Sequence, residues 1–151
     1  MVRSALRQKE DAMPPRVFDH RDDPNGTMLA TEQVRARFLR REPGQDLSGF
    51  HSHIESGGIE TWVILEGAAR FDFRDGSVVA TAGQAVFAWP DEPHRVVCHG
   101  DQPVAYFLTV SPHREPTHTH FDEAGNQLPP RNSNMKLAWR GEPSPGVDGR
   151  R

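Results

Sequence analysis

The stretch GFHSHIESGGIETWVILEG, running from Gly49 to Gly67, decides the fold of this 151-residue chain. Its second half contains a run of β-branched, aromatic and aliphatic residues from Thr61 to Leu65, a composition that favours a strand. The pair Gly57-Gly58 precedes this run and marks a turn, because glycine accepts the backbone angles that tight turns require. We therefore expect one strand at about 47–54 and a second at 59–66.

Similar apolar runs continue in both directions. Turn residues separate them at intervals of roughly ten residues, which is typical of a β-sandwich or barrel. The expected strands lie at 33–42, 47–54, 59–66, 68–74, 77–82, 84–89, 94–98 and 104–110. Asp75-Gly76 is the clearest hairpin signal, because this pair supplies the positive φ angles of a tight hairpin. The expected core contains Phe38, Trp62, Ile64, Phe71, Phe73, Phe87, Trp89, Tyr106 and Leu108. The predicted fold class is all-β.

One segment leaves an alternative open. The arginines between Thr31 and Arg41 could decorate one face of a helix, and Pro43-Gly44 would then end that helix. The alternation of Val34, Ala36 and Phe38 instead favours a strand, since residues two apart lie on the same face of a strand. We prefer the strand.

The composition fits one domain with irregular ends. The 13 glycines and 13 prolines suit a fold with many turns, and the low mean hydropathy of -0.70 implies that part of the chain lies outside the core. The predicted organisation is an N-terminal arm over residues 1–26, a barrel over 27–112 and a partly irregular C-terminal extension over 113–151. The ends are long enough to cross to a second protomer.

Charge and cysteine content argue against several functional classes. Residues 46–110 carry 3 basic and 9 acidic side chains, the opposite of a nucleic-acid-binding face. No run of 18 apolar residues is present, and the first residues lack the apolar region of a signal peptide, so we expect no membrane association and a cytoplasmic location. The single cysteine, Cys98, excludes an internal disulfide framework and a cysteine-rich zinc site. Any metal must be held by histidines and carboxylates.

The residues that carry chemistry are His51, His53, Glu60 and His94. His51 and His53 are two apart, so they project from one face of a strand and can share a metal ion. The Gly57-Gly58 turn is expected to fold the next strand back beside them and to bring Glu60 close. Three imidazoles and one carboxylate suit a divalent transition metal and leave coordination positions open. We expect iron, manganese, nickel or zinc ahead of magnesium or calcium, which prefer oxygen ligands.

In these residues the sequence resembles the cupin superfamily, whose members are small double-stranded β-helix barrels. The first cupin motif places a glycine before His-x-His, then a glutamate and, after six further residues, another glycine. Gly44, His51, His53, Glu60 and Gly67 fill those positions here. In the second motif, Gly83, Pro90 and His94 do so.

The match to the motifs has departures. Six residues separate His53 from Glu60 where the motif has three or four, so Glu55 is an alternative carboxylate ligand. The six-residue step from Glu60 to Gly67 favours Glu60. In the second motif Glu92 stands at a glycine position, and Cys98 stands at the usual asparagine position.

The resemblance implies a double-stranded β-helix (jelly-roll) fold, a bound metal and a homodimer. It also implies a metal-dependent enzyme that acts on a small oxygenated organic molecule by dioxygenase, isomerase or lyase chemistry. Glu60 is the candidate that could act both as ligand and as general base. The alternative is a non-catalytic module that binds metal and a small ligand, as a sensor or accessory protein.

Several further residues are candidates for the substrate pocket. Phe38, Trp62 and Tyr106 are expected to form its walls. Arg37, or its neighbour Arg35, could bind a substrate carboxylate, although either arginine could equally be a solvated charge on the strand. A second His-x-His, formed by His118 and His120, follows two prolines, and we expect it to be a solvated edge segment.

Overall fold

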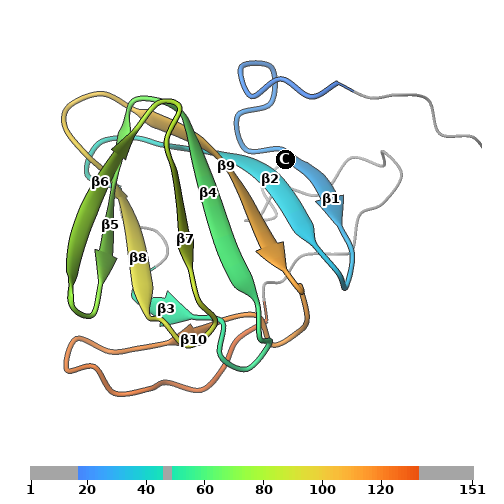
Figure 1. Cartoon of the computed structure of the whole chain (residues 1–151), viewed down its shortest axis with the longest axis vertical. Coiled ribbons are helices and arrows are strands. Elements are labelled where there is room, and N and C mark those ends of the chain that lie inside the picture. Colours follow the sequence, from blue (N-terminus) through green and yellow to red (C-terminus); the bar gives the residue numbers. More distant parts are fainter. Residues whose placement is uncertain (1–16, 46–48, 133–151) are drawn as a thin grey trace, which may run out of the picture.

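In the part of the chain that the structure describes, ten strands form two antiparallel five-stranded sheets that face each other (Figure 1). The structure, a computed structural model, describes residues 17–45 and 49–132. The strands are β1 (Thr27–Ala30), β2 (Arg35–Arg41), β3 (His51–Ser52), β4 (Ile59–Glu66), β5 (Ala68–Phe73), β6 (Gly76–Thr81), β7 (Ala85–Ala88), β8 (His94–Cys98), β9 (Val104–Ser111) and β10 (Thr119–His120). The first sheet has the order β1-β2-β9-β4-β7, and the second has the order β10-β3-β8-β5-β6. This is the predicted all-β, double-stranded β-helix fold. Within the described residues no helix is long and apolar enough to cross a membrane.

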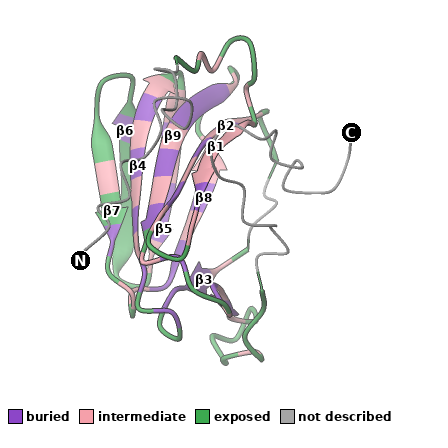
Figure 2. Ribbon diagram, turned by 90° about the vertical axis from the view of Figure 1, so that its right-hand side faces the viewer, coloured by how far each residue is buried: buried purple, intermediate pink, exposed green. Residues whose placement is uncertain are grey.

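Strand β4 shows how the sequence pattern builds the core. Its residues alternate between buried and partly buried along most of the strand (Figure 2), so Glu60, Trp62 and Ile64 all point to the inner face. This alternation is the period-two pattern of a strand with one face against a core. Trp62 and Ile64 are each 1% exposed, and the fully buried Phe71 meets them from the second sheet. The apolar core therefore lies between the sheets.

The expected strand over residues 33–42 is confirmed, and the helical alternative between Thr31 and Arg41 is wrong. Strand β2 pairs with β9 in unbroken antiparallel register from Arg35↔Val110 to Arg41↔Val104. The hairpin at Asp75-Gly76 is also present, and Phe73 pairs with Gly76 across it. Hydrogen bonding to β9 along the whole of β2 favours the strand over any local helical preference.

Some expectations need correction. Strands β1 and β10 were not expected, and each is short and pairs with one neighbouring strand at a sheet edge. Of the expected strand at 47–54 only His51–Ser52 is strand, and residues 46–48 lie outside the described part of the chain. Phe87 and Trp89 were expected in the core, but they are 51% and 54% exposed.

Gly67 and Gly83 provide a test of how the motif glycines support the fold. Both have a positive φ, but a Cβ on Gly67 would lie 2.3 Å from the Pro103 carbonyl oxygen, whereas a Cβ on Gly83 would have no atom within 4 Å. Gly83→Ala should therefore cost about 1–2 kcal/mol for the left-handed backbone alone. Gly67→Ala should lower the free energy of unfolding further, because the Pro103 backbone must move. Urea denaturation of both variants measures the difference, and equal losses would contradict the prediction.

Candidate metal centre

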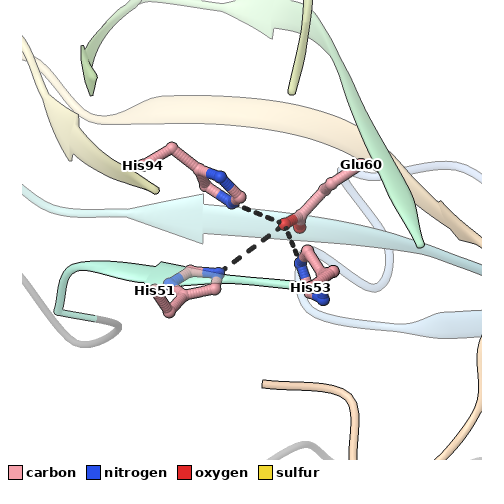
Figure 3. Close-up of side chains that lie close together, drawn as sticks. All are labelled: His51, His53, Glu60 and His94. Carbon is pink, nitrogen blue, oxygen red and sulfur yellow. Dashed lines mark hydrogen bonds and ion pairs between the residues drawn. The ribbon is translucent and has the colours of Figure 1, made fainter. Parts of the chain in front are cut away.

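Four buried side chains meet between the two sheets (Figure 3). His51, His53, Glu60 and His94 each offer one ligand atom, and all four atoms lie within 4.8 Å of one another. The Glu60 Oε2 atom lies 2.8 Å from Nε2 of His53 and 3.1 Å from Nε2 of His94. The corresponding distance to His51 is 3.7 Å. These are the four residues that the sequence singled out.

The second sheet supplies the histidines and the first sheet supplies the carboxylate. His51 of β3 pairs directly with His94 of β8, and paired residues point to the same face of a sheet. Glu60 comes from β4 across the sandwich, where β4 pairs with β7 and β9. The expectation that β4 would lie beside the histidine strand is therefore wrong. The chain crosses from one sheet to the other at this turn, and Glu60 approaches the histidines from the opposite side.

The segment between His53 and Glu60 is an ordered turn. The Gly57 N–H donates to the His53 carbonyl oxygen at 2.8 Å, and the Ser56 hydroxyl donates to the same oxygen at 3.2 Å. A Cβ on Gly58 would lie 2.9 Å from the Pro112 carbonyl oxygen, so this turn packs tightly against the residues after β9. The longer spacing between His53 and Glu60 is thus accommodated by the turn. Glu55, the alternative carboxylate, is exposed and is not among the four grouped side chains.

A backbone carbonyl orients each of the three imidazole rings. Nδ1 of His51 lies 3.1 Å from the Gly49 oxygen, Nδ1 of His94 lies 2.8 Å from the Glu92 oxygen, and Nδ1 of His53 lies 2.5 Å from the Thr117 oxygen. A carbonyl can only accept, so each Nδ1 carries a proton and donates it to the backbone, which leaves Nε2 of each ring as the atom that faces Glu60 and can bind a metal ion. Three imidazole nitrogens and a carboxylate oxygen that lie this close together form a set of four metal-ligand atoms. The donor set therefore fits a divalent transition metal.

The electrostatics of Glu60 agree with this arrangement. Burial on its own raises the pKa of Glu60, but hydrogen bonds with His51, His53 and His94 outweigh burial and hold the pKa well below its ordinary value. The carboxylate is therefore ionised at neutral pH although Glu60 is only 4% exposed. A buried carboxylate is stable only with such partners. The site keeps an anionic ligand in place for a cation.

The expected pocket residues divide into two groups. Trp62 packs on the site, and its ring centroid lies 5.1 Å from that of His94. Arg37 and Tyr106 are also buried on the inner face, at 2% and 3% exposure. Phe38 is not brought to the site. It alternates with Arg37 along β2, and its ring packs on His20 and Phe107 on the other face of the sheet.

The sequence interpretation missed His118 and His120. Expected to be a solvated edge segment, they instead lie against the site, because β10 pairs with β3 and places His120 opposite His51. The ring centroid of His118 lies 4.9 Å from that of His51 and 5.0 Å from that of His53. Burial lowers the pKa of His118 to about 2, and repulsion from His51 and His53 adds to this shift. The signal for these residues was the second His-x-His itself.

Comparisons with known proteins agree with the fold and the motif positions. A sequence model of the family described as "Cupin domain" matches residues 37–111. No curated protein matches the chain.

Many solved structures are similar to this one. An uncharacterised conserved protein with a double-stranded β-helix domain from Klebsiella pneumoniae is 21% identical, with a TM-score of 0.56 over 66% of this chain and 91% of the other. A cupin 2 domain-containing protein from Halorhodospira halophila is 18% identical, with a TM-score of 0.54 over 62% and 61%. The DMSP lyase DddQ from Ruegeria pomeroyi is 21% identical, with a TM-score of 0.51 over 60% and 44%. At these identities the likeness concerns the fold alone.

Metal content is expected to depend on the four grouped residues and on no other histidine. Substituting His51, His53 or His94 by alanine removes one ligand from a shared ion, and Glu60→Gln removes the negative charge of the fourth ligand. Because each change weakens the affinity for the metal, the amount of bound metal should fall at least 10-fold in each variant. Inductively coupled plasma mass spectrometry of protein purified without a polyhistidine tag measures this.

Matched controls are Glu55→Gln and His118→Ala, which should retain the metal. Glu55 is exposed, and His118 contacts the rings without belonging to the group of four. Loss of metal in either control together with full metal content in Glu60→Gln would refute the assignment.

Proposed function

Because the chain belongs to the cupin superfamily and groups four ligand atoms at one point, we propose that it is a metal-dependent enzyme acting on a small oxygenated organic molecule. The proposed metal ligands are His51, His53, Glu60 and His94. The proposed chemistry is that of a dioxygenase, an isomerase or a lyase. The observation that carries the proposal is the convergence of three ring nitrogens and one carboxylate in a buried site.

The donor set favours iron, manganese, nickel or zinc. Imidazole nitrogens are borderline-soft ligands, whereas magnesium and calcium favour shells of oxygen. When bound, such a metal supplies a Lewis acid that polarises oxygen atoms of the substrate. Four protein ligands leave room for one or two more in an octahedral or five-coordinate shell.

The protein's own residues supply the rest of the chemistry. Glu60 is the only acidic ligand, and it would exchange between holding the metal and, as general base, holding a proton taken from the substrate. Trp62 covers the His94 ring and keeps water from that side of the centre. His118 lies over His51 and His53, where it can contact a substrate bound at the metal.

Turnover is the test of this proposal. The protein is loaded separately with Fe(II), Mn(II), Ni(II) and Zn(II) and incubated with hydroxy acids, keto acids, catechols and enediols, and consumption is followed by proton NMR. At least one metal form is expected to consume one of these classes. Glu60→Gln removes the general base and should reduce the rate of substrate consumption about 10²–10⁴-fold. The two proteins are compared on samples with the same metal content. Ligand binding without turnover in every metal form would contradict an enzyme and favour a binding module.

We also propose that the protein forms a homodimer through the outer face of the first sheet. This face carries a row of apolar side chains in lateral register, Phe38, Phe107, Val63 and Ala85. Phe87 and Trp89 extend it, with ring centroids 5.3 Å apart, and both are more than half exposed. Exposed apolar surface of this kind is typical of protein interfaces, and a second copy of the chain would cover it.

Light scattering tests the dimer. The wild-type protein should have the mass of two chains at micromolar concentration, and Phe87→Glu should shift it to the mass of one, because a charge would be buried in the interface. Val78→Glu is the control, since Val78 is 48% exposed but lies on the other sheet. A monomeric wild-type protein would contradict the proposal.

A further inference from the structure

Arg35 and Glu60 lie in one row across the first sheet. Both residues pair with Val110 of β9, Arg35 from β2 and Glu60 from β4. Residues paired in this way point to the same face, so the Arg35 side chain enters the sandwich beside the metal centre. Two strand spacings separate the Cα atoms of Arg35 and Glu60 by about 10 Å. At 5% exposure, Arg35 is a buried cation at the level of the site.

Arg37 occupies a different place. It lies one row further along β2, paired with Leu108, which in turn pairs with Trp62. Its guanidinium donates to the backbone oxygens of Asn25 and Phe38, at 3.2 and 3.4 Å. Of the two arginines, Arg35 is therefore the one at the level of Glu60. Burial lowers the pKa of Arg35, and the nearby Glu60 and Glu115 carboxylates partly offset this shift.

A bound metal would add to the positive charge on the inner face. Arg35 and Arg37 are buried cations there and Glu60 is a buried anion, and the Glu115 carboxylate also acts on Arg35. Arginine does not lose its proton in proteins, so a buried guanidinium favours anions and hydrogen-bond acceptors close to it. Because a guanidinium has five N–H donors, it can hold a ligand oxygen together with a protein oxygen. A carboxylate on the substrate would match this site in both charge and geometry.

His113 supplies a second polar group near Arg35. It lies just after β9, is 3% exposed, and its Nδ1 faces the Thr31 oxygen at 3.3 Å. Its Nε2 atom is buried and, among the described residues, has no hydrogen-bond partner. Burial lowers the pKa of His113, and the nearby Arg35 charge adds to the effect, so the ring is neutral and Nε2 is an acceptor. A ligand hydroxyl is the kind of donor that would satisfy it.

We propose that the substrate is a small hydroxycarboxylic acid whose carboxylate binds Arg35 and whose hydroxyl group donates to Nε2 of His113. This inference rests on the proposed metal-dependent function and adds the chemical class of the substrate. The carboxylate lies on the β2 side of the site, and an oxygen of the bound acid keeps lone pairs for a metal held by Glu60 and the three histidines. Arg35 thus selects acids, and His113 selects those that carry a hydroxyl group.

Isothermal titration calorimetry of the metal-loaded protein tests the proposal. The probes are glycolate, 3-hydroxypropanoate and 4-hydroxybutanoate, each compared with its primary amide and with the acid that lacks the hydroxyl group. At least one hydroxy acid should bind at least 10-fold more tightly than its amide. The same hydroxy acid should bind more tightly than the acid without the hydroxyl. Equal affinity for acid and amide, or no binding of any acid, would overturn the proposal.

Variants separate Arg35 from the metal centre. Arg35→Met removes the charge but keeps an unbranched apolar side chain, and Arg35→Lys keeps the charge. Arg35→Met should bind the hydroxy acid at least 10-fold more weakly than the wild type does and should bind the amide with unchanged affinity. Arg35→Lys should keep part of the preference for the acid over the amide. Arg40→Gln, on the same strand but paired with Glu42, should bind like the wild type.

Metal content and circular dichroism are measured on the same samples. A folded Arg35→Met with full metal content and unchanged acid binding overturns the role of Arg35 and leaves the metal centre intact. A wild-type protein that takes up no metal overturns the proposed function, and with it this inference.

Discussion

Three imidazole rings share a single carboxylate oxygen, and the arrangement of both sheets depends on this contact. Glu60 is buried on the first sheet, where an isolated negative charge would be costly. The groups that stabilise it, His51, His53 and His94, come from the opposite side of the sandwich. The two sheets must therefore face each other at a fixed spacing. The backbone carbonyls that accept from the three Nδ1 atoms keep the rings from turning away.

Part of the grouping of these four residues was predictable from local sequence. His51 and His53 are two residues apart, and both reach the site although β3 ends at Ser52. The proline-rich turn ahead of His94 starts β8 at that residue. Gly67 was predictable for a similar reason. Its positive φ and its contact with the Pro103 oxygen admit no side chain, so a glycine at this spacing marks a definite point in the fold.

The other features of the site depended on pairing between strands that are far apart in the sequence, and local sequence patterns do not encode such pairing. Alternation shows that Arg37 and Phe38 lie on opposite faces but not which face is inner, and Phe38 was assigned to the pocket although it lies on the outer face. The role of His118 depends on the pairing of β10 with β3, two strands far apart in the sequence. Two residues of strand are too few to give a periodic signal.

The inner face of the sandwich changes character along its length. Across the first sheet, the row through Glu60 contains Arg35, the next row contains Trp62 and Arg37, and the row after that contains Tyr106 and Ile64. The buried charged side chains of this sheet thus lie in the first two of these rows, and the third row belongs to the core. The apolar layer supplies most of the stability through buried area. It also lowers the local dielectric, which strengthens the attraction between Glu60 and a bound cation. Substitutions at Trp62 would therefore act on both the core and the site, whereas Ile64 lies two rows away and contributes to the core alone.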